Sequence, residues 1–364
     1  MRLDSGHSKA GLTKRLLEAA PVIGEWRELV ETCCISTLRA VRQGAPFIKV
    51  GRMPEQAKPA PVVYPLLERG KPTLLYGPGG QGKSFIAAGC CIAVNTGEPF
   101  VAGFTPQRGR ALYLDWEDGP ETLDSRLKAL CAGLGLDPVD VDYRNGHTLL
   151  RREVNRLAEF IYGHGISLVV IDSVGLAAGS AGREGSYEEV ALSFFEALRE
   201  LARSGPSSAV PAILLVDHVS GDSLKRQPGE NRAFGSVYKT NMARQAFEVR
   251  SVPAPSGAAL NMGLFHTKVN HGAKLPPIGL RLEFHAGDVV TFGRTDVRDT
   301  PELSSKVALI FRVLHLLRGG PRSNRELADA LSTDGKTVTA DTVRITCDRH
   351  LQLRGDKPVS LARL

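Results

Sequence analysis

The chain has 364 residues with a formal net charge of +7, and 42% of the residues are hydrophobic and 23% are charged. This composition excludes a wholly disordered chain, and the length predicts one large domain with an appendage. Both ends are basic, with 12 basic against 7 acidic side chains in residues 1–72 and 11 against 6 in residues 304–364, which favours nucleic-acid binding and plain surface solvation about equally.

The N-terminal residues are expected to form a helical arm. Residues 8–43 are predicted to contain two helices, the second of which has apolar residues at helical spacing. A connector with three prolines, residues 54–61, separates these helices from the rest of the chain. We therefore predict an N-terminal arm and linker over residues 1–60.

From residue 73 onward, short apolar runs alternate with longer amphipathic segments. The runs predict strands at 73–76, 111–115, 166–172 and 212–217, and the segments between them predict helices at 83–95, 121–133, 150–162 and 187–204. Such alternation is typical of a parallel sheet with helices on both faces. Strand-like runs at 246–250, 260–267, 280–284 and 288–292 predict an antiparallel extension. We therefore predict an α/β domain over residues 61–298.

The C-terminal residues 304–364 are expected to form a separate small unit. Three helices are predicted. The first covers 305–317, the second begins at a capping box that starts with Ser323, and the third covers 339–351. A turn at 354–358 is expected to join two short strands. Three helices followed by a hairpin predict a winged helix-turn-helix domain.

Neither a membrane span nor a disulfide framework is predicted. The longest apolar run, residues 85–94, is too short to cross a bilayer, and residues 1–25 lack the apolar stretch of a signal peptide. The six cysteines include two vicinal pairs and no C-x-x-C motif, which is typical of reduced thiols. We therefore expect a cytoplasmic protein without a membrane partner.

The segment after the strand at 73–76 matches the phosphate-binding spacing G-x-x-x-x-G-K-[ST]. Its glycines allow successive backbone N–H groups to surround phosphate oxygens, and the helix that follows adds a favourable dipole. Lys83 is expected to neutralise the β- and γ-phosphates, and the Ser84 hydroxyl to bind Mg²⁺. The sequence therefore predicts a site for ATP and Mg²⁺ at Gly77, Pro78, Gly79, Gly80, Gln81, Gly82, Lys83 and Ser84.

Acidic residues follow two other predicted strands. Asp172 ends the strand at 166–172, where P-loop proteins place a second metal-binding group, although an aspartate at a strand end can also cap a helix. The carboxyl ends of parallel strands line one ligand crevice, so the acids after the strand at 111–115 are expected to reach the same site. Glu117 is the candidate for activating the attacking water, with Asp118 and Asp115 as competitors.

Together these segments resemble the motifs of RecA-type motor ATPases. The P-loop, residues 112–118, 169–173 and the strand at 214–218 are most similar to the RepA-like hexameric replicative helicases of plasmids and phages. The resemblance covers residues 60–295 and implies that Glu117 is the catalytic glutamate and that His218 senses the γ-phosphate. A structural histidine is the alternative at position 218.

The resemblance also implies residues that act on a neighbouring subunit. Arg232 is similar to the family's arginine finger, with one extra residue before the following Gly-Ser, and Lys268 is similar to a lysine that points into the neighbour's site. Such cations stabilise transition-state charge only in an assembled ring. Surface salt bridges are the alternative for both residues.

Two places are expected to contact DNA. The segment after His218 carries the adjacent cations Lys225 and Arg226, which suit a phosphate backbone, although a plain surface loop explains them equally well. In the predicted winged helix, Arg344 and Arg349 lie on the expected recognition helix. Winged helices also bind proteins, so a protein partner is the alternative there.

These features predict a DNA-dependent ATPase that forms a homo-oligomer, with a hexamer expected. The leading function is a helicase that moves on single-stranded DNA during replication of a plasmid, phage or mobile element, with replication proteins as further partners. A DNA-binding regulatory or loading ATPase without unwinding activity is the alternative. A small-molecule P-loop kinase is disfavoured, because such kinases need a phosphoacceptor lid and no cations in trans.

Overall fold

The computed structural model describes residues 5–21, 25–43, 60–179, 185–219, 237–270, 272–304, 307, 309–332 and 337–352. The chain divides into two compact units, Met1–Lys58 and Pro59–Leu364. No helix within these described ranges is both long and apolar enough to span a membrane. The six cysteines, all of which fall inside the described ranges, are free thiols.

The smaller unit contains the two predicted helices, α1 (Gly6–Ala19) and α2 (Trp26–Gln43). The Trp26 indole N–H donates a hydrogen bond to the carbonyl of Ala20 at 2.8 Å, which holds the turn between the helices. An ion pair of 2.8 Å between Lys9 and Glu31 joins their flanks. The arm is therefore a helical pair.

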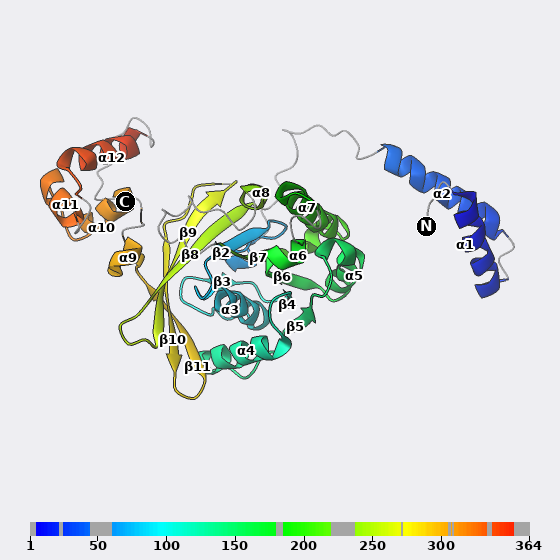
Figure 1. Ribbon diagram of the computed structural model, residues 1–364, viewed down its shortest axis with the longest axis horizontal. Helices are drawn as coiled ribbons and strands as arrows, with labels where there is room; N and C mark the ends of the chain where they lie inside the picture. Colours follow the sequence, from blue (N-terminus) through cyan, green and yellow to red (C-terminus); the bar gives the residue numbers. More distant parts are fainter. Residues whose placement is uncertain are drawn as a thin grey trace. The chain divides into compact units, whose positions relative to one another are not determined.

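Within the described residues of the larger unit, nine strands form one sheet (Figure 1). In spatial order they are β11 (Val289–Thr295), β10 (Ile278–His285), β9 (Ala259–Val269), β8 (Gln245–Pro253), β2 (Thr73–Gly77), β7 (Ala212–His218), β6 (Ile166–Asp172), β4 (Arg110–Asp115) and β5 (Asp142–Asn145). The six strands from β8 to β5 are parallel, and β9, β10 and β11 continue the sheet in antiparallel pairs. This arrangement confirms the predicted α/β fold with a mostly parallel sheet.

Helices cover both faces of the parallel part (Figure 1). One face packs against α3 (Lys83–Thr96) and α4 (Pro120–Leu134), and the other against α5 (Leu150–Gly163), α6 (Val174–Ala178) and α7 (Tyr187–Arg203). Successive side chains of a strand point to opposite faces, so a strand buried on both sides is apolar throughout. Strand β4 illustrates this, because Tyr113 joins the first core and Leu114 the second.

Some elements were not predicted, because their sequences are short or polar. Edge strand β5 has only four half-buried residues, two of them charged, and therefore lacks an apolar run. The short pieces β1 (Val63–Tyr64) and β3 (Thr105–Pro106) form a separate antiparallel pair. The remaining short helices are α6, α8 (Val237–Met242), α9 (Pro301–Ser304) and the 3₁₀ turns Ser207–Ala209 and Val297–Asp299.

The C-terminal part contains α10 (Leu309–Leu317), α11 (Asn324–Leu331) and α12 (Ala340–Gln352), which pack around a small core that includes Val313 and Val343. Ser323 caps α11 through the predicted capping box. The turn at 354–358 lies outside the described residues. The winged-helix assignment and the bounds of the three predicted domains stay predictions.

Candidate functional site

The P-loop joins the central strand β2 to helix α3. Gly80 and Gly82 have φ angles of +72° and +78°, in the left-handed region that residues with a Cβ rarely adopt. A Cβ at Gly80 would meet no heavy atom within 4 Å, so the loop is open to a ligand at this point. Residues 80–85 line a cavity of about 200 Å³. The fold thus brings Gly80 to Ser84 of the predicted phosphate-binding segment to the wall of one cavity.

The ammonium group of Lys83 lies buried under this loop, with the residue only 4% exposed. Its Nζ donates hydrogen bonds to the carbonyls of Gly77 at 2.9 Å and Pro78 at 2.7 Å. Burial lowers the pKa of Lys83 to about 8, while the nearby carboxylates of Asp172 and Glu117 oppose the shift. A bound anion would further favour the charged amine, so this position suits a phosphate.

Asp172 at the end of β6 meets the hydroxyl of Ser84. Ser84 Oγ donates to Asp172 Oδ2 at 2.9 Å, and the Tyr113 hydroxyl donates to the same oxygen at 2.6 Å. Asp172 is 4% exposed, and among the described residues its Oδ1 is buried without a hydrogen-bond partner. Burial raises the pKa of Asp172, and the two hydrogen bonds act to lower it. The buried free oxygen is suited to a cation or its water shell.

These residues fit Mg²⁺ better than a metal held by protein groups alone. Within the described ranges, no group of three or more His, Cys, Asp or Glu side chains could hold a metal ion. Mg²⁺ is typically bound by one or two protein oxygens together with substrate phosphates and waters. Ser84 Oγ and Asp172 Oδ1 are the oxygens that would hold it beside a triphosphate.

The three competing acids after β4 have different surroundings. Asp115 is buried, and its Oδ1 accepts hydrogen bonds from the backbone N–H groups of Glu117 at 2.9 Å and Asp118 at 3.0 Å. Asp118 pairs with Arg126 at 3.1 Å. The carboxylate of Glu117 instead reaches His218, with 3.1 Å between Oε2 and Nε2. Asp115 therefore shapes the turn, and Glu117 faces the P-loop side.

His218, at the end of β7, lies between two other predicted site residues. Its Nδ1 is 3.5 Å from Lys83 Nζ, and its Nε2 contacts Glu117. Strand β7 separates the P-loop strand β2 from β6, so its end lies between the ends of both. The site is thus a row of parallel strand ends, as the sequence predicted.

A buried ion pair holds the residue before His218. Asp217 Oδ1 accepts a hydrogen bond from the backbone N–H of His218 at 3.0 Å, and Oδ2 is 3.0 Å from Lys239 Nζ on α8. The side chains of Asp217 and Lys239 are 2% and 7% exposed. Burial raises the pKa of Asp217, and the lysine acts in the opposite direction. The pair therefore joins α8 to the strand end that carries His218, a contact that was not predicted.

Replacing Lys239 with methionine is expected to lower the free energy of unfolding by about 3–5 kcal/mol, because it leaves a buried carboxylate without its partner. Denaturant unfolding of the full chain measures this loss. Adding Asp217→Asn should recover part of it, since the carboxylate is then neutral. The control is Lys128→Met, which breaks an exposed pair with Asp124. Equal effects at 239 and 128 would contradict a buried structural pair.

Aromatic and cationic side chains complete the wall of the P-loop cavity. Phe85, Arg126, Leu260 and Phe284 line it together with His218. The rings of Phe85 and Phe284 meet edge to face at 5.6 Å, and the Arg126 guanidinium lies 5.8 Å from the centre of the Phe85 ring. Such a wall can contact the base of a nucleotide. The sequence did not reveal it, because Leu260 and Phe284 come from antiparallel strands far along the chain.

The described residues among the remaining predictions, Lys268, Arg344 and Arg349, do not line this cavity. Arg232, Lys225 and Arg226 lie outside the described residues. Lys268 Nζ donates hydrogen bonds to three carbonyls at the end of α8. These belong to Thr240, at 2.9 Å, Ala243, at 2.7 Å, and Asn241. On α12, Arg349 is exposed and Arg344 pairs with Asp341 at 3.5 Å and Asp348 at 3.4 Å.

A family profile described as the AAA domain matches residues 42–223, which is half of the chain. The chain belongs to this AAA domain family. The matched AAA domain segment contains the P-loop, Glu117, Asp172 and His218. A comparison with curated proteins finds no match.

Family and fold together make the protein a P-loop ATPase. An AAA domain implies nucleotide binding, typically with Mg²⁺, and the P-loop on a mostly parallel sheet is the expected frame for it. The AAA domain match ends before Arg232 and before strands β8 to β11. The residues predicted to act in trans therefore lie beyond it.

Proposed function

We propose that this AAA domain protein is a ring-forming DNA helicase of RepA-like type, with a hexamer of identical subunits as the working assembly. Its substrate would be single-stranded DNA during replication of a plasmid, phage or mobile element, in company with other replication proteins. The RepA-like motifs support this function. A regulatory or loading ATPase without unwinding activity is the second candidate, supported by the exposed arginines of α12.

The observation that carries the proposal is the position of His218. Its imidazole contacts both Lys83 and Glu117, which supports a role in sensing whether the γ-phosphate is present. The chain that follows contains Lys225, Arg226 and Arg232, and then returns at α8, which Lys239 ties to the same strand end. The segment proposed to contact DNA and the neighbouring subunit is thus connected to the nucleotide site at both of its ends.

The mechanism follows from the chemistry of each residue. Bound ATP with Mg²⁺ would supply the bond to be hydrolysed and a cation that neutralises phosphate charge. Lys83 would bind the terminal phosphates, while Ser84 and Asp172 would hold the metal. Glu117 would accept the proton of the attacking water, which its acceptor-only carboxylate can do. His218 would keep Glu117 oriented through the contact at 3.1 Å.

Arg232 and Lys268 are proposed to complete the neighbour's site. In the single chain the Lys268 ammonium is bound by carbonyls at the end of α8, and burial lowers the pKa of Lys268. To act in trans it must exchange these carbonyls for a phosphate. This exchange would free the carbonyls at the end of α8, so that subunit contact would be coupled to the helix that Lys239 joins to the strand end before His218.

Single-stranded DNA is expected to raise the ATPase rate of the wild-type chain at least several-fold, because a motor couples turnover to movement. Steady-state ATPase assays with and without DNA measure this, and a tailed-duplex assay then measures strand displacement. Stimulation with displacement supports the helicase, whereas stimulation without displacement supports the loading or regulatory ATPase. An ATPase rate that does not change at any DNA concentration would contradict both the helicase and the loading or regulatory ATPase.

A further inference from the structure

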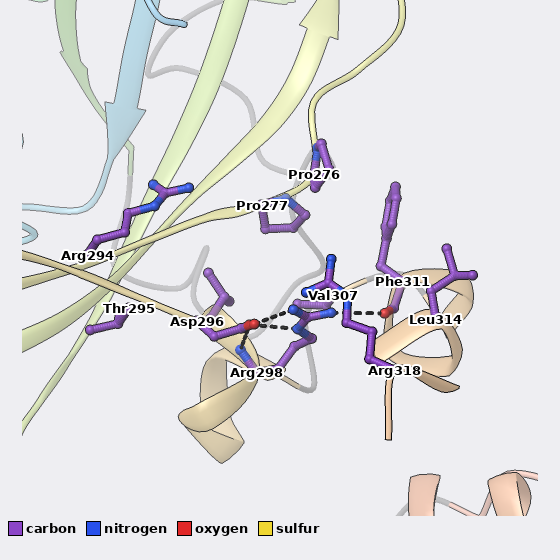
Figure 2. A pocket seen from close by; sticks show the side chains of 11 residues that line it. Pro276, Pro277, Arg294, Thr295, Asp296, Arg298, Val307, Phe311, Leu314 and Arg318 are labelled. Carbon is purple, nitrogen blue, oxygen red and sulfur yellow. Dashed lines mark hydrogen bonds and ion pairs between the residues drawn. The ribbon is translucent and has the colours of Figure 1, made fainter. Parts of the chain in front are cut away.

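A second cavity, of about 480 Å³, lies where the sheet meets helix α10 (Figure 2). Residues 294–298, at the end of β11, form its sheet side, and Phe311, Leu314 and Arg318 form its helix side. Its volume is in the range of ordinary ligand sites. The site described above uses none of these residues.

This cavity is remote from the P-loop. Strand β10 starts beside Pro277, which lines the second cavity, and reaches Phe284, which lines the P-loop cavity. An extended strand rises about 3.3 Å per residue, so these two residues are about 23 Å apart. The two cavities therefore lie at opposite ends of one strand and cannot share a ligand of nucleotide size.

The lining of the second cavity is cationic. It contains three arginines against a single aspartate, a net charge of +2. Asp296 is already paired, because Arg298 Nε donates to its Oδ1 at 2.6 Å, and this hydrogen bond lowers the pKa of Asp296 to about 2. Arg298 also donates to the carbonyl of Phe311 at 3.4 Å. Through these two hydrogen bonds, Arg298 joins Asp296 at the end of the sheet to Phe311 on α10.

The other two arginines are available to a ligand. Within the described part of the chain, the side chains of Arg294 and Arg318 have no hydrogen bond or ion pair. Arg294 enters the cavity lining from β11, and Arg318 enters it from the turn directly after α10 (Figure 2). Partial burial lowers the pKa of Arg294, a penalty that a bound anion would offset. Guanidinium groups bind phosphate oxygens through paired N–H donors.

Flat apolar surface lies beside these charges. Phe311 is half-buried, and Pro276, Pro277 and Leu314 add apolar wall. A phenylalanine ring next to free guanidinium groups is the combination that binds a base and its phosphate. A carboxylate side chain of an acidic peptide would use the arginines but would offer no flat surface to the ring and the prolines.

We propose that this cavity is a second nucleotide-binding site, with the phosphate on Arg294 and Arg318 and the base against Phe311. The nucleotide unit is either a free mononucleotide or one residue of a single-stranded nucleic acid, since both present the same chemistry. The site goes beyond the proposed motor function and does not depend on it, because it is assayed without ATP hydrolysis.

The test uses the full chain with Lys83→Ala, which silences the P-loop. Two probes are titrated without ATP: thymidine monophosphate by calorimetry, and a fluorescein-labelled oligothymidylate of about 12 nucleotides by anisotropy. Arg294→Gln with Arg318→Gln is expected to weaken binding at least about tenfold, because charged hydrogen bonds are lost. Phe311→Leu, which keeps apolar volume, is expected to weaken binding about tenfold through lost stacking.

The matched control is Arg199→Gln, an exposed arginine on α7 outside this cavity. Unchanged thermal unfolding of every variant shows that the loss is local. Loss of thymidine monophosphate binding identifies a free-nucleotide site, and loss confined to the oligonucleotide identifies a nucleic-acid site. Either result supports the proposal, even if DNA does not stimulate the ATPase and the proposed motor function is contradicted.

Three results would overturn the proposal. One is undiminished binding of both probes by the double arginine variant, and another is an equal loss in Arg199→Gln. The third is displacement of the oligonucleotide by polyglutamate together with no effect of Phe311→Leu, which would identify an acidic-peptide surface instead.

Discussion

Replacing Lys83 with alanine is expected to weaken ATP binding at least about a hundredfold, because a charged hydrogen bond contributes about 3 kcal/mol in a buried setting. Lys83 is 4% exposed, and its ammonium is already held in place beneath the loop by two loop carbonyls. Calorimetric titration with ATP and Mg²⁺ measures the loss directly.

The control for this variant is Lys128→Ala, an exposed lysine of α4 paired with Asp124. It removes the same charge from the surface and should bind ATP like the wild type. Unfolding curves of both variants separate lost binding from lost folding. Tight ATP binding by a folded Lys83→Ala chain would reject the assignment of residues 77–84 as the phosphate site.

Replacing Glu117 with glutamine is expected to preserve ATP binding while slowing hydrolysis about 10²- to 10⁴-fold, the usual contribution of a general base. Glutamine keeps the size of the side chain and can still hydrogen-bond to His218, but it cannot accept the proton of water. Single-turnover hydrolysis with bound ATP isolates this step from binding and product release.

The matched comparison is Asp118→Asn in the same turn. Asp118 pairs with Arg126 rather than with His218, so its replacement should change hydrolysis far less. Wild-type turnover by Glu117→Gln would remove Glu117 from the proposed role. A larger loss in Asp118→Asn would transfer that role to Asp118.

The strands that carry the site could be predicted because their signals are local. The strand at 166–172 agrees with β6 at both ends, and the other three predicted core strands agree with β2, β4 and β7 to within one residue at each end. Buried parallel strands are continuous apolar runs, and a polar residue marks where each one leaves the core. The contact of Ser84 with Asp172 then follows from the parallel order of the strands.

The partners of these residues could not be predicted, because they depend on packing across the sheet. Tyr113 occupies a core position of β4 that any large apolar residue would suit, and its hydroxyl finds Asp172 only once β4 and β6 pair. Lys239 lies in a short helix without a periodic pattern, and its burial beside Asp217 leaves no trace in the local sequence. Tertiary contacts of this kind are decided by packing and not by the local sequence.

The carboxylate of Asp115 has a consequence for how the turn that carries Glu117 is held. Its Oδ1 holds the backbone of Glu117 and Asp118, and its Oδ2 accepts a hydrogen bond of 3.2 Å from the hydroxyl of Tyr143 on β5. That strand is the outermost on its side of the described sheet. A contact at this outer edge of the sheet would therefore act through two hydrogen bonds on Glu117, the residue proposed to activate water, without entering the P-loop cavity.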